Sequence, residues 1–210
     1  MIDWKEKLNS DSFVNVPVPH FRIYDVLSKD LHDRFYESYM NIVRDRIILE
    51  DHTHGHAPGS RLHIWKPSKP QPLTSEWRVL LNTLSMAGPE VSEIWNSFSS
   101  DNIVCTIPSE QVRFNHWTKE GFVPGEYVQT WHRDGEHDKL VAIYYLGTGK
   151  EEQGNFELIN ENTSETADYE FKANSMIIFL NRPPQMHRFK HTSYGYDRRT
   201  LYTAWAHEGT

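Results

Sequence analysis

The chain has 210 residues, of which 38% are hydrophobic, 13% are aromatic and 24% are charged, and its formal net charge at pH 7 is −7. This length is expected to give one domain, 1–210, with one substantial core. No apolar run approaches the length of a membrane-spanning helix, and the acidic balance without a basic stripe argues against nucleic acid as a partner.

The N-terminal segment and the cysteine content bear on the compartment. MIDWKEKLNSDS is polar and charged and lacks the apolar stretch of a secretory signal, so a cytoplasmic location is expected. The single cysteine, Cys105, agrees with a reducing compartment. It also excludes an internal disulfide and a thiolate-built metal site, so a bound metal would need histidine and carboxylate ligands.

The first half of the chain, 1–107, is expected to be mainly helical. Residues 20–27 read as a strand, and the apolar residues that follow recur at helical spacing, which predicts a helix near 29–46. Two further helices are predicted at 75–85 and 89–99, separated by an Ala-Gly-Pro break. Their apolar stripes are expected to pack outside a β core.

After residue 107 the pattern changes to short β-rich runs separated by turns. Eight strands in about a hundred residues favour a sandwich or jelly-roll barrel over alternating βαβ units. The fold class is therefore mostly β with flanking helices (α+β), with a jelly-roll core over 108–207. The predicted strands are QVRFNHW (111–117), GEYVQTWH (125–132), LVAIYYLG (140–147), NFELIN (155–160), ADYEFKA (167–173), SMIIFLN (175–181), QMHRFKH (185–191) and RTLYTAWAH (199–207).

The sequence lacks the common motifs of nucleotide-binding proteins and serine hydrolases. It contains no Gly-x-Gly-x-x-Gly, no P-loop and no Gly-x-Ser-x-Gly. These absences remove the usual nucleotide and hydrolase interpretations.

A metal site is predicted at His132 and Asp134. In a chain with 12 histidines a lone His-x-Asp proves little, but residues i and i+2 of a strand share a face. A third ligand from a neighbouring strand is offered by His187, which follows a Pro-Pro turn. Two histidines and a carboxylate leave open positions on an octahedral ion, the facial triad of non-haem Fe(II) oxygenases. His191 remains an alternative third ligand.

A second histidine cluster lies in EDHTHGHAPGSRLH. Its ligand types could hold a metal on one strand face, but the segment reads as a loop, and a solvated loop near an active-site mouth is the simpler interpretation. The cluster contains Asp51, His52, His54, His56 and His63.

The second half of the chain resembles the 2-oxoglutarate/Fe(II)-dependent dioxygenase superfamily, close in pattern to its prolyl 4-hydroxylase-like branch. His132-x-Asp134 and His187 match the iron ligands of that superfamily. AIYYL (142–146) matches the strand in which the second tyrosine, Tyr145, binds the far carboxylate of 2-oxoglutarate. RRTLYTAW (198–205) matches the last strand of the double-stranded β-helix core, which carries a basic residue for the same carboxylate.

The register of that last strand selects one of two adjacent arginines. Arg199 stands six positions before Trp205, as the resemblance requires, and strand alternation puts Thr203 and Trp205 on the same face as Arg199. Thr203 is then expected at the cofactor and Trp205 at the substrate, with Arg198 pointing away. The register Arg198-x-Thr200, which resembles other branches, stays open.

The first predicted barrel strand contributes three alternating residues. Relatives line the pocket from this strand, so Asn115 and Trp117 are expected near 2-oxoglutarate and Arg113 near the substrate, although ordinary strand alternation explains the pattern equally well. Gly154 resembles the glycine that leads the strand after the His-x-Asp loop, or is a turn glycine.

The resemblance implies an Fe(II)- and 2-oxoglutarate-dependent dioxygenase with O2 as co-substrate. Succinate and CO2 would form while a substrate C–H is hydroxylated, and Asp134 favours hydroxylation over halogenation. The substrate is expected to be a small, amino-acid-like molecule or a peptide, with no membrane or nucleic-acid partner. The alternatives are a non-catalytic barrel and a cupin-like metalloenzyme that needs no 2-oxoglutarate.

Overall fold

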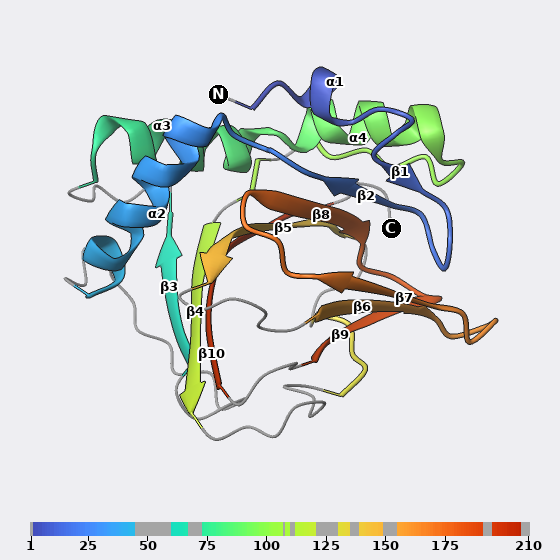
Figure 1. Ribbon diagram of the computed structural model, residues 1–210. Coiled ribbons are helices and arrows are strands. Elements are labelled where there is room, and N and C mark those ends of the chain that lie inside the picture. The colour runs from blue at the N-terminus through green and yellow to red at the C-terminus, as the bar shows by residue number, and fades with distance from the viewer. Residues whose placement is uncertain are drawn as a thin grey trace.

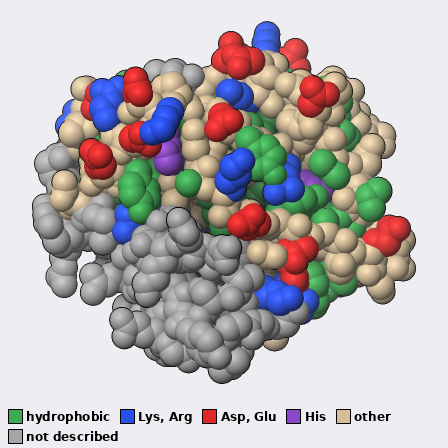
Figure 2. Space-filling view, in the orientation of Figure 1, with side chains coloured by type: hydrophobic (Ala, Val, Ile, Leu, Met, Phe, Trp, Pro, Cys, Tyr) green, Lys and Arg blue, Asp and Glu red, His purple; other side chains and the backbone are tan. Residues whose placement is uncertain are grey.

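The computed structural model describes residues 2–44, 60–66, 73–106, 108–109, 112–120, 130–134, 139–148, 155–190 and 195–206. Within these ranges no helix is long and apolar enough to cross a membrane. On the face shown in Figure 2, lysine and arginine side chains are interspersed with aspartate and glutamate, as is usual for a solvated surface.

The strands of the described residues form two antiparallel sheets that face each other (Figure 1). The larger sheet has the order β1 (Phe13–Val14), β2 (His20–Ile23), β8 (Ser175–Leu180), β5 (Lys139–Thr148), β10 (Gly195–Ala206), β4 (Val112–Glu120) and β3 (Ser60–Trp65). The smaller sheet has the order β7 (Thr166–Glu170), β6 (Asn155–Asn160) and β9 (Gln185–Lys190). This two-layer arrangement confirms the predicted jelly-roll.

Helices cover the outer face of the larger sheet (Figure 1). They are α1 (Trp4–Lys7), α2 (Lys29–Arg44), α3 (Ser75–Met86) and α4 (Gly88–Phe98). Thr74 caps α3 by accepting a hydrogen bond from the Trp77 backbone N–H, and Pro89 stands in the first turn of α4, where a missing N–H costs nothing.

The larger sheet is buried on both faces because it separates two apolar cores. One core lies between this sheet and the helices and contains Trp77, Trp95 and Trp205. The other lies between the two sheets and includes Val141 of β5 and Phe179 of β8. All six residues of β8 are consequently buried.

A β-bulge in β5 interrupts its pairing with β10. Arg199 pairs with Gly147 and Thr200 pairs with Tyr145, so Leu146 is an extra residue in β5. Gly147 has φ +155°, and a Cβ added to it would lie 2.6 Å from Cε2 of Tyr36 on α2. The bulge therefore turns Gly147 toward the helices and leaves Tyr145 in the core between the sheets.

Most predicted elements are confirmed within the described residues. The predicted helices correspond to α2, α3 and α4, and seven of the predicted strands correspond to β4 to β10. Of the predicted strand 125–132, residues 125–129 lie outside the described residues, and His132 forms an isolated bridge. The expectation of a loop is wrong for residues 60–63, since β3 lies there and pairs with β4.

Candidate active site

His132, Asp134 and His187 lie together between the two sheets. One potential ligand atom from each lies within 4.8 Å of the others. The Nε2 atoms of His132 and His187 are 3.9 and 3.8 Å from Oδ1 of Asp134. The three side chains are therefore close enough together to be candidate ligands of one metal ion.

A backbone bridge brings the two histidines together from positions far apart in the sequence. The His132 N–H donates to the His187 carbonyl at 3.1 Å, and the His187 N–H donates to the His132 carbonyl at 3.0 Å. Their ring centroids are 4.4 Å apart. His187 is on the face of β9 that points to the inter-sheet core, where its ring contacts Phe156 and Phe179.

The surroundings of each histidine favour a metal-binding form of its ring, for different reasons. Nδ1–H of His132 donates to the Thr130 carbonyl at 2.9 Å, which leaves Nε2 unprotonated in the neutral ring. Burial lowers the pKa of His187 to about 4, with Asp134 opposing the shift and His132 adding to it. His187 is therefore neutral at pH 7, as a metal ligand must be.

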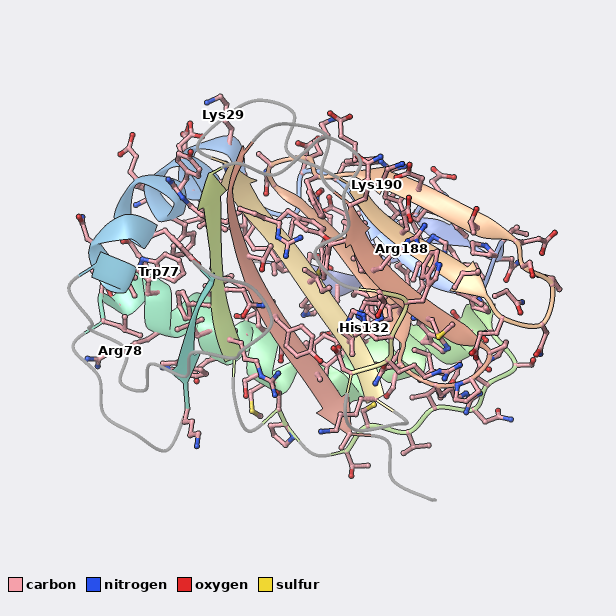
Figure 3. All side chains as sticks on the ribbon, turned by 90° about the horizontal axis from the view of Figure 1, so that it is seen from below. Lys29, Trp77, Arg78, His132, Arg188 and Lys190 are labelled. Carbon is pink, nitrogen blue, oxygen red and sulfur yellow. The ribbon has the colours of Figure 1, made fainter. Side chains whose placement is uncertain are left out.

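The segment that carries His132 and Asp134 is fixed by its neighbours on the small sheet. The guanidinium carbon of Arg188 lies 4.0 Å from the ring centroid of Trp131, and Arg188 Nε donates to Glu157 at 2.5 Å. Arg133 pairs with Glu161 beyond the end of β6. Arg188 and Lys190 of β9 lie above His132 in Figure 3.

Arg198 and Tyr145 lie in the same inter-sheet region as His187. The Arg198 guanidinium carbon is 3.9 Å from the ring centroid of Phe189, and Phe189 also contacts the His187 ring edge-on. The Tyr145 hydroxyl is buried and has no hydrogen-bond partner among the described residues. Burial raises the pKa of Tyr145, with Arg198 opposing the rise, so the neutral phenol can donate a hydrogen bond.

The sequence of the site-bearing region matches a known family. Residues 122–207 match the model described as 2OG-Fe(II) oxygenase superfamily. This match places the region 122–207 in the 2OG-Fe(II) oxygenase superfamily. The protein is accordingly an oxygenase whose cofactors are Fe(II) and 2-oxoglutarate.

Solved oxygenase structures share the fold at low sequence identity. A Pseudomonas putida prolyl-4-hydroxylase is 13% identical with a TM-score of 0.60 over 89% of this chain and 91% of that chain. EctD from S. alaskensis with 2-oxoglutarate and 5-hydroxyectoine is 15% identical, with a TM-score of 0.57 over 89% of this chain and 71% of that chain. A Trichoplax adhaerens prolyl hydroxylase in complex with a hypoxia inducible factor peptide fragment is 12% identical, with a TM-score of 0.57 over 94% of this chain and 85% of that chain. None of the curated proteins matches the chain.

The donor set fits the cofactors of this oxygenase. Two imidazoles and one carboxylate on one side of the inter-sheet space suit Fe(II) and leave positions for other ligands. A buried guanidinium beside a neutral phenol suits a carboxylate of 2-oxoglutarate.

The predicted inward face of the last strand is wrong. The Arg199 guanidinium carbon lies 4.8 Å from the ring centroid of Tyr36 on α2, and Trp205 belongs to the core under the helices. Thr203 alternates onto the same outward face. Arg198, the arginine of the competing register, instead lies against the aromatic rings of the inter-sheet core.

The first barrel strand, β4, has Arg113 on the face that contacts Tyr202. The Arg113 guanidinium carbon lies 5.1 Å from the ring centroid of Tyr202, and Asn115 alternates onto the face of Arg113. Trp117 occupies the next position on this face, opposite Arg198, but its side chain is outside the described part. Also outside it are Asp51, His52, His54, His56, His137, Gly154 and His191.

Two residues at the site were not expected from the sequence. Tyr202 donates from its hydroxyl to Oδ2 of Asp134 at 2.9 Å. Asn181 accepts from the Asp134 N–H and donates to the Asp134 carbonyl, both at 3.1 Å. A polar residue directly after the apolar strand β8 was the available signal for Asn181. Tyr202 would have followed from choosing the Arg198 register.

Proposed function

We propose that His132, Asp134 and His187 hold the iron of this oxygenase, and that Arg198 and Tyr145 bind the far carboxylate of 2-oxoglutarate. When bound, Fe(II) and 2-oxoglutarate supply the oxidative chemistry, in which O2 is consumed, succinate and CO2 form and a substrate C–H is hydroxylated. The observation that carries the proposal is that a buried guanidinium and a neutral phenol share the inter-sheet core with the three-residue cluster.

Arg198 and Tyr145 suit the carboxylate for different reasons. A planar guanidinium can donate two parallel hydrogen bonds to a carboxylate and stays charged when it leaves water. The phenol of Tyr145 adds one donor and no charge, because burial raises its pKa. Phe171 and Phe189 lie against the guanidinium, so they exclude water from the carboxylate and strengthen its attraction to Arg198.

We propose a small, amino-acid-like molecule or a peptidyl side chain as the substrate. The similar structures include one with 5-hydroxyectoine and one with a peptide fragment, so the fold is compatible with both kinds. Arg113 is proposed to contact the substrate, because it lies beside Tyr202, whose hydroxyl reaches Asp134.

The test is an anaerobic titration of the Fe(II)-loaded protein with 2-oxoglutarate, followed by the visible charge-transfer band of the chelate. The wild type is expected to develop the band, and His187→Ala is expected to lack it. Arg198→Ala should raise the dissociation constant of 2-oxoglutarate about 100-fold, since a buried charged pair loses one partner. Arg199→Ala is the matched control and should bind 2-oxoglutarate like the wild type.

Two outcomes would contradict the proposal in different ways. If iron binds but no band develops in the wild type, 2-oxoglutarate does not chelate the metal and a cupin-like centre is favoured. If Arg199→Ala weakens 2-oxoglutarate binding and Arg198→Ala does not, the assignment of the two arginines is reversed.

A further inference from the structure

Asn181 fixes the backbone of Asp134. It directly follows β8 and is buried. Its side-chain amide makes two hydrogen bonds to the main chain of Asp134. The Asn181 backbone N–H in turn donates to the Lys139 carbonyl at the start of β5. With its backbone held, the Asp134 carboxylate keeps only the rotations of its own short side chain.

Tyr202 restricts the rotation of the Asp134 carboxylate. Its hydroxyl donates to Oδ2, while Oδ1 is the oxygen that lies 3.8 and 3.9 Å from the two histidine Nε2 atoms. A carboxylate whose two oxygens have different partners has one preferred rotation. The Arg113 guanidinium lies over the Tyr202 ring, and this contact orients the phenol.

We propose that Tyr202 is a positioning residue that holds Asp134 with Oδ1 toward the metal and keeps Oδ2 away from it. This inference rests on the proposed function, because it takes Asp134 as a metal ligand. Hydrogen bonds to the ligands of a metal typically contribute about 10- to 100-fold in metal affinity. Removing the Tyr202 hydroxyl therefore lets the carboxylate rotate and weakens metal binding, while the aromatic ring and its packing remain.

The test uses Co2+ as the probe, because its visible absorption reports the number and arrangement of its ligands without turnover. Metal-free wild type, Tyr202→Phe, Tyr144→Phe and His187→Ala are titrated with Co2+. Tyr202→Phe should show a dissociation constant about tenfold higher than the wild type. Its cobalt spectrum should also differ, since a rotated carboxylate changes the ligand field.

Tyr144→Phe is the matched control. Like the half-buried Tyr202, the buried Tyr144 donates a hydrogen bond to a side chain, here Oδ1 of Asn174, but Tyr144 faces the core under the helices. Its variant should reproduce the wild-type cobalt affinity and spectrum. Thermal unfolding of the metal-free proteins checks that both variants are folded during the titration.

The outcomes separate this inference from the proposed function. If wild type and His187→Ala bind Co2+ alike, the proposed metal centre is wrong and the inference fails with it. If His187→Ala loses binding while Tyr202→Phe keeps the wild-type affinity and spectrum, only the role of Tyr202 is overturned. If Tyr144→Phe weakens Co2+ binding as much as Tyr202→Phe does, the positioning role of Tyr202 is overturned as well, because the loss would then be a general structural effect.

Discussion

Trp205 connects the larger sheet to the helices above it. Its indole N–H donates to the Leu84 carbonyl at 2.9 Å, and its ring meets Trp4 edge-on with centroids 6.4 Å apart. The indole also lies against Gly88, where an added Cβ would be 2.9 Å from Trp205 Cδ1. The residue is fully buried, so its role is to stabilise the fold rather than to contact the substrate.

Trp205→Phe is therefore expected to reduce stability without changing cofactor binding. A smaller ring leaves a cavity and removes the donor to Leu84, which together should lower the free energy of unfolding by about 2 to 3 kcal/mol. Denaturant unfolding measures this loss, and the anaerobic titration should give a wild-type dissociation constant for 2-oxoglutarate. A large loss of 2-oxoglutarate affinity at unchanged stability would place Trp205 at the cofactor instead.

Residue spacing predicted which side chains share a face but not which face is inside. Arg199, Thr203 and Trp205 do lie on one face of β10, and that face points to the helices. The polarity of the residues could not show which face of β10 points to the inter-sheet core. Both faces of the sheet are buried, and each carries a buried arginine, Arg198 or Arg199. The spacing did indicate the cluster of His132, Asp134 and His187, although His132 forms only an isolated bridge and Asp134 lies in no strand.

The bulge in β5 determines how this strand presents its residues. Leu146 and Gly147 are consecutive, yet both face the helical layer, and Tyr145 is thereby kept on the inner face. Tyr36 of α2 occupies the space that a side chain at position 147 would need. The bulge thus combines a backbone conformation that favours glycine with a close approach of a helix.

Gly147→Ala is expected to destabilise the protein for both reasons. The positive φ strains any side chain, and the new methyl group meets the Tyr36 ring, so the free energy of unfolding should fall by about 2 to 3 kcal/mol. Thermal or denaturant unfolding measures the loss. In a Tyr36→Leu background the same substitution should cost less, since part of the clash is removed; an equal cost in both backgrounds would mean that backbone strain alone is responsible.

Elements with a strong local pattern were predictable, and those that depend on a partner were not. α2, α3 and α4 carry apolar stripes at helical spacing, which is information within one segment. β3 lies in a segment whose histidine, glycine and proline content indicates a loop, and its pairing is with β4, about 50 residues later in the chain. Strand formation there depends on a surface that a local pattern does not reveal.

At the scale of the molecule, His20 and Tyr169 join the two sheets at one edge. Nδ1–H of His20 in β2 donates to the Val18 carbonyl at 2.7 Å, and Nε2 accepts from the Tyr169 hydroxyl of β7 at 2.5 Å. Burial lowers the pKa of His20 to about 4, the Val18 carbonyl opposes the shift, and Arg22 adds to it. The junction therefore requires the neutral imidazole.

This requirement predicts a loss of stability in mild acid. Between pH 6.5 and about 4 the unfolded chain binds a proton at His20 that the folded protein does not, so stability falls as the pH falls through this window. From pH 7 to pH 4.5 the contribution is about 2 kcal/mol. His20→Gln should reduce the difference in unfolding free energy between these pH values by that amount in metal-free protein; an unchanged difference would contradict the assignment.

The backbone bridge between His132 and His187 has a consequence for how the oxygenase acquires its metal. Because hydrogen bonds between the two segments already hold the rings side by side, loading requires little folding, and a chelated protein should be reloaded without refolding. A preformed set of two imidazoles and a carboxylate follows the usual order of divalent affinities, in which Ni2+ and Cu2+ exceed Fe2+. Iron occupancy would then depend on which metals the cell makes available rather than on discrimination by the site.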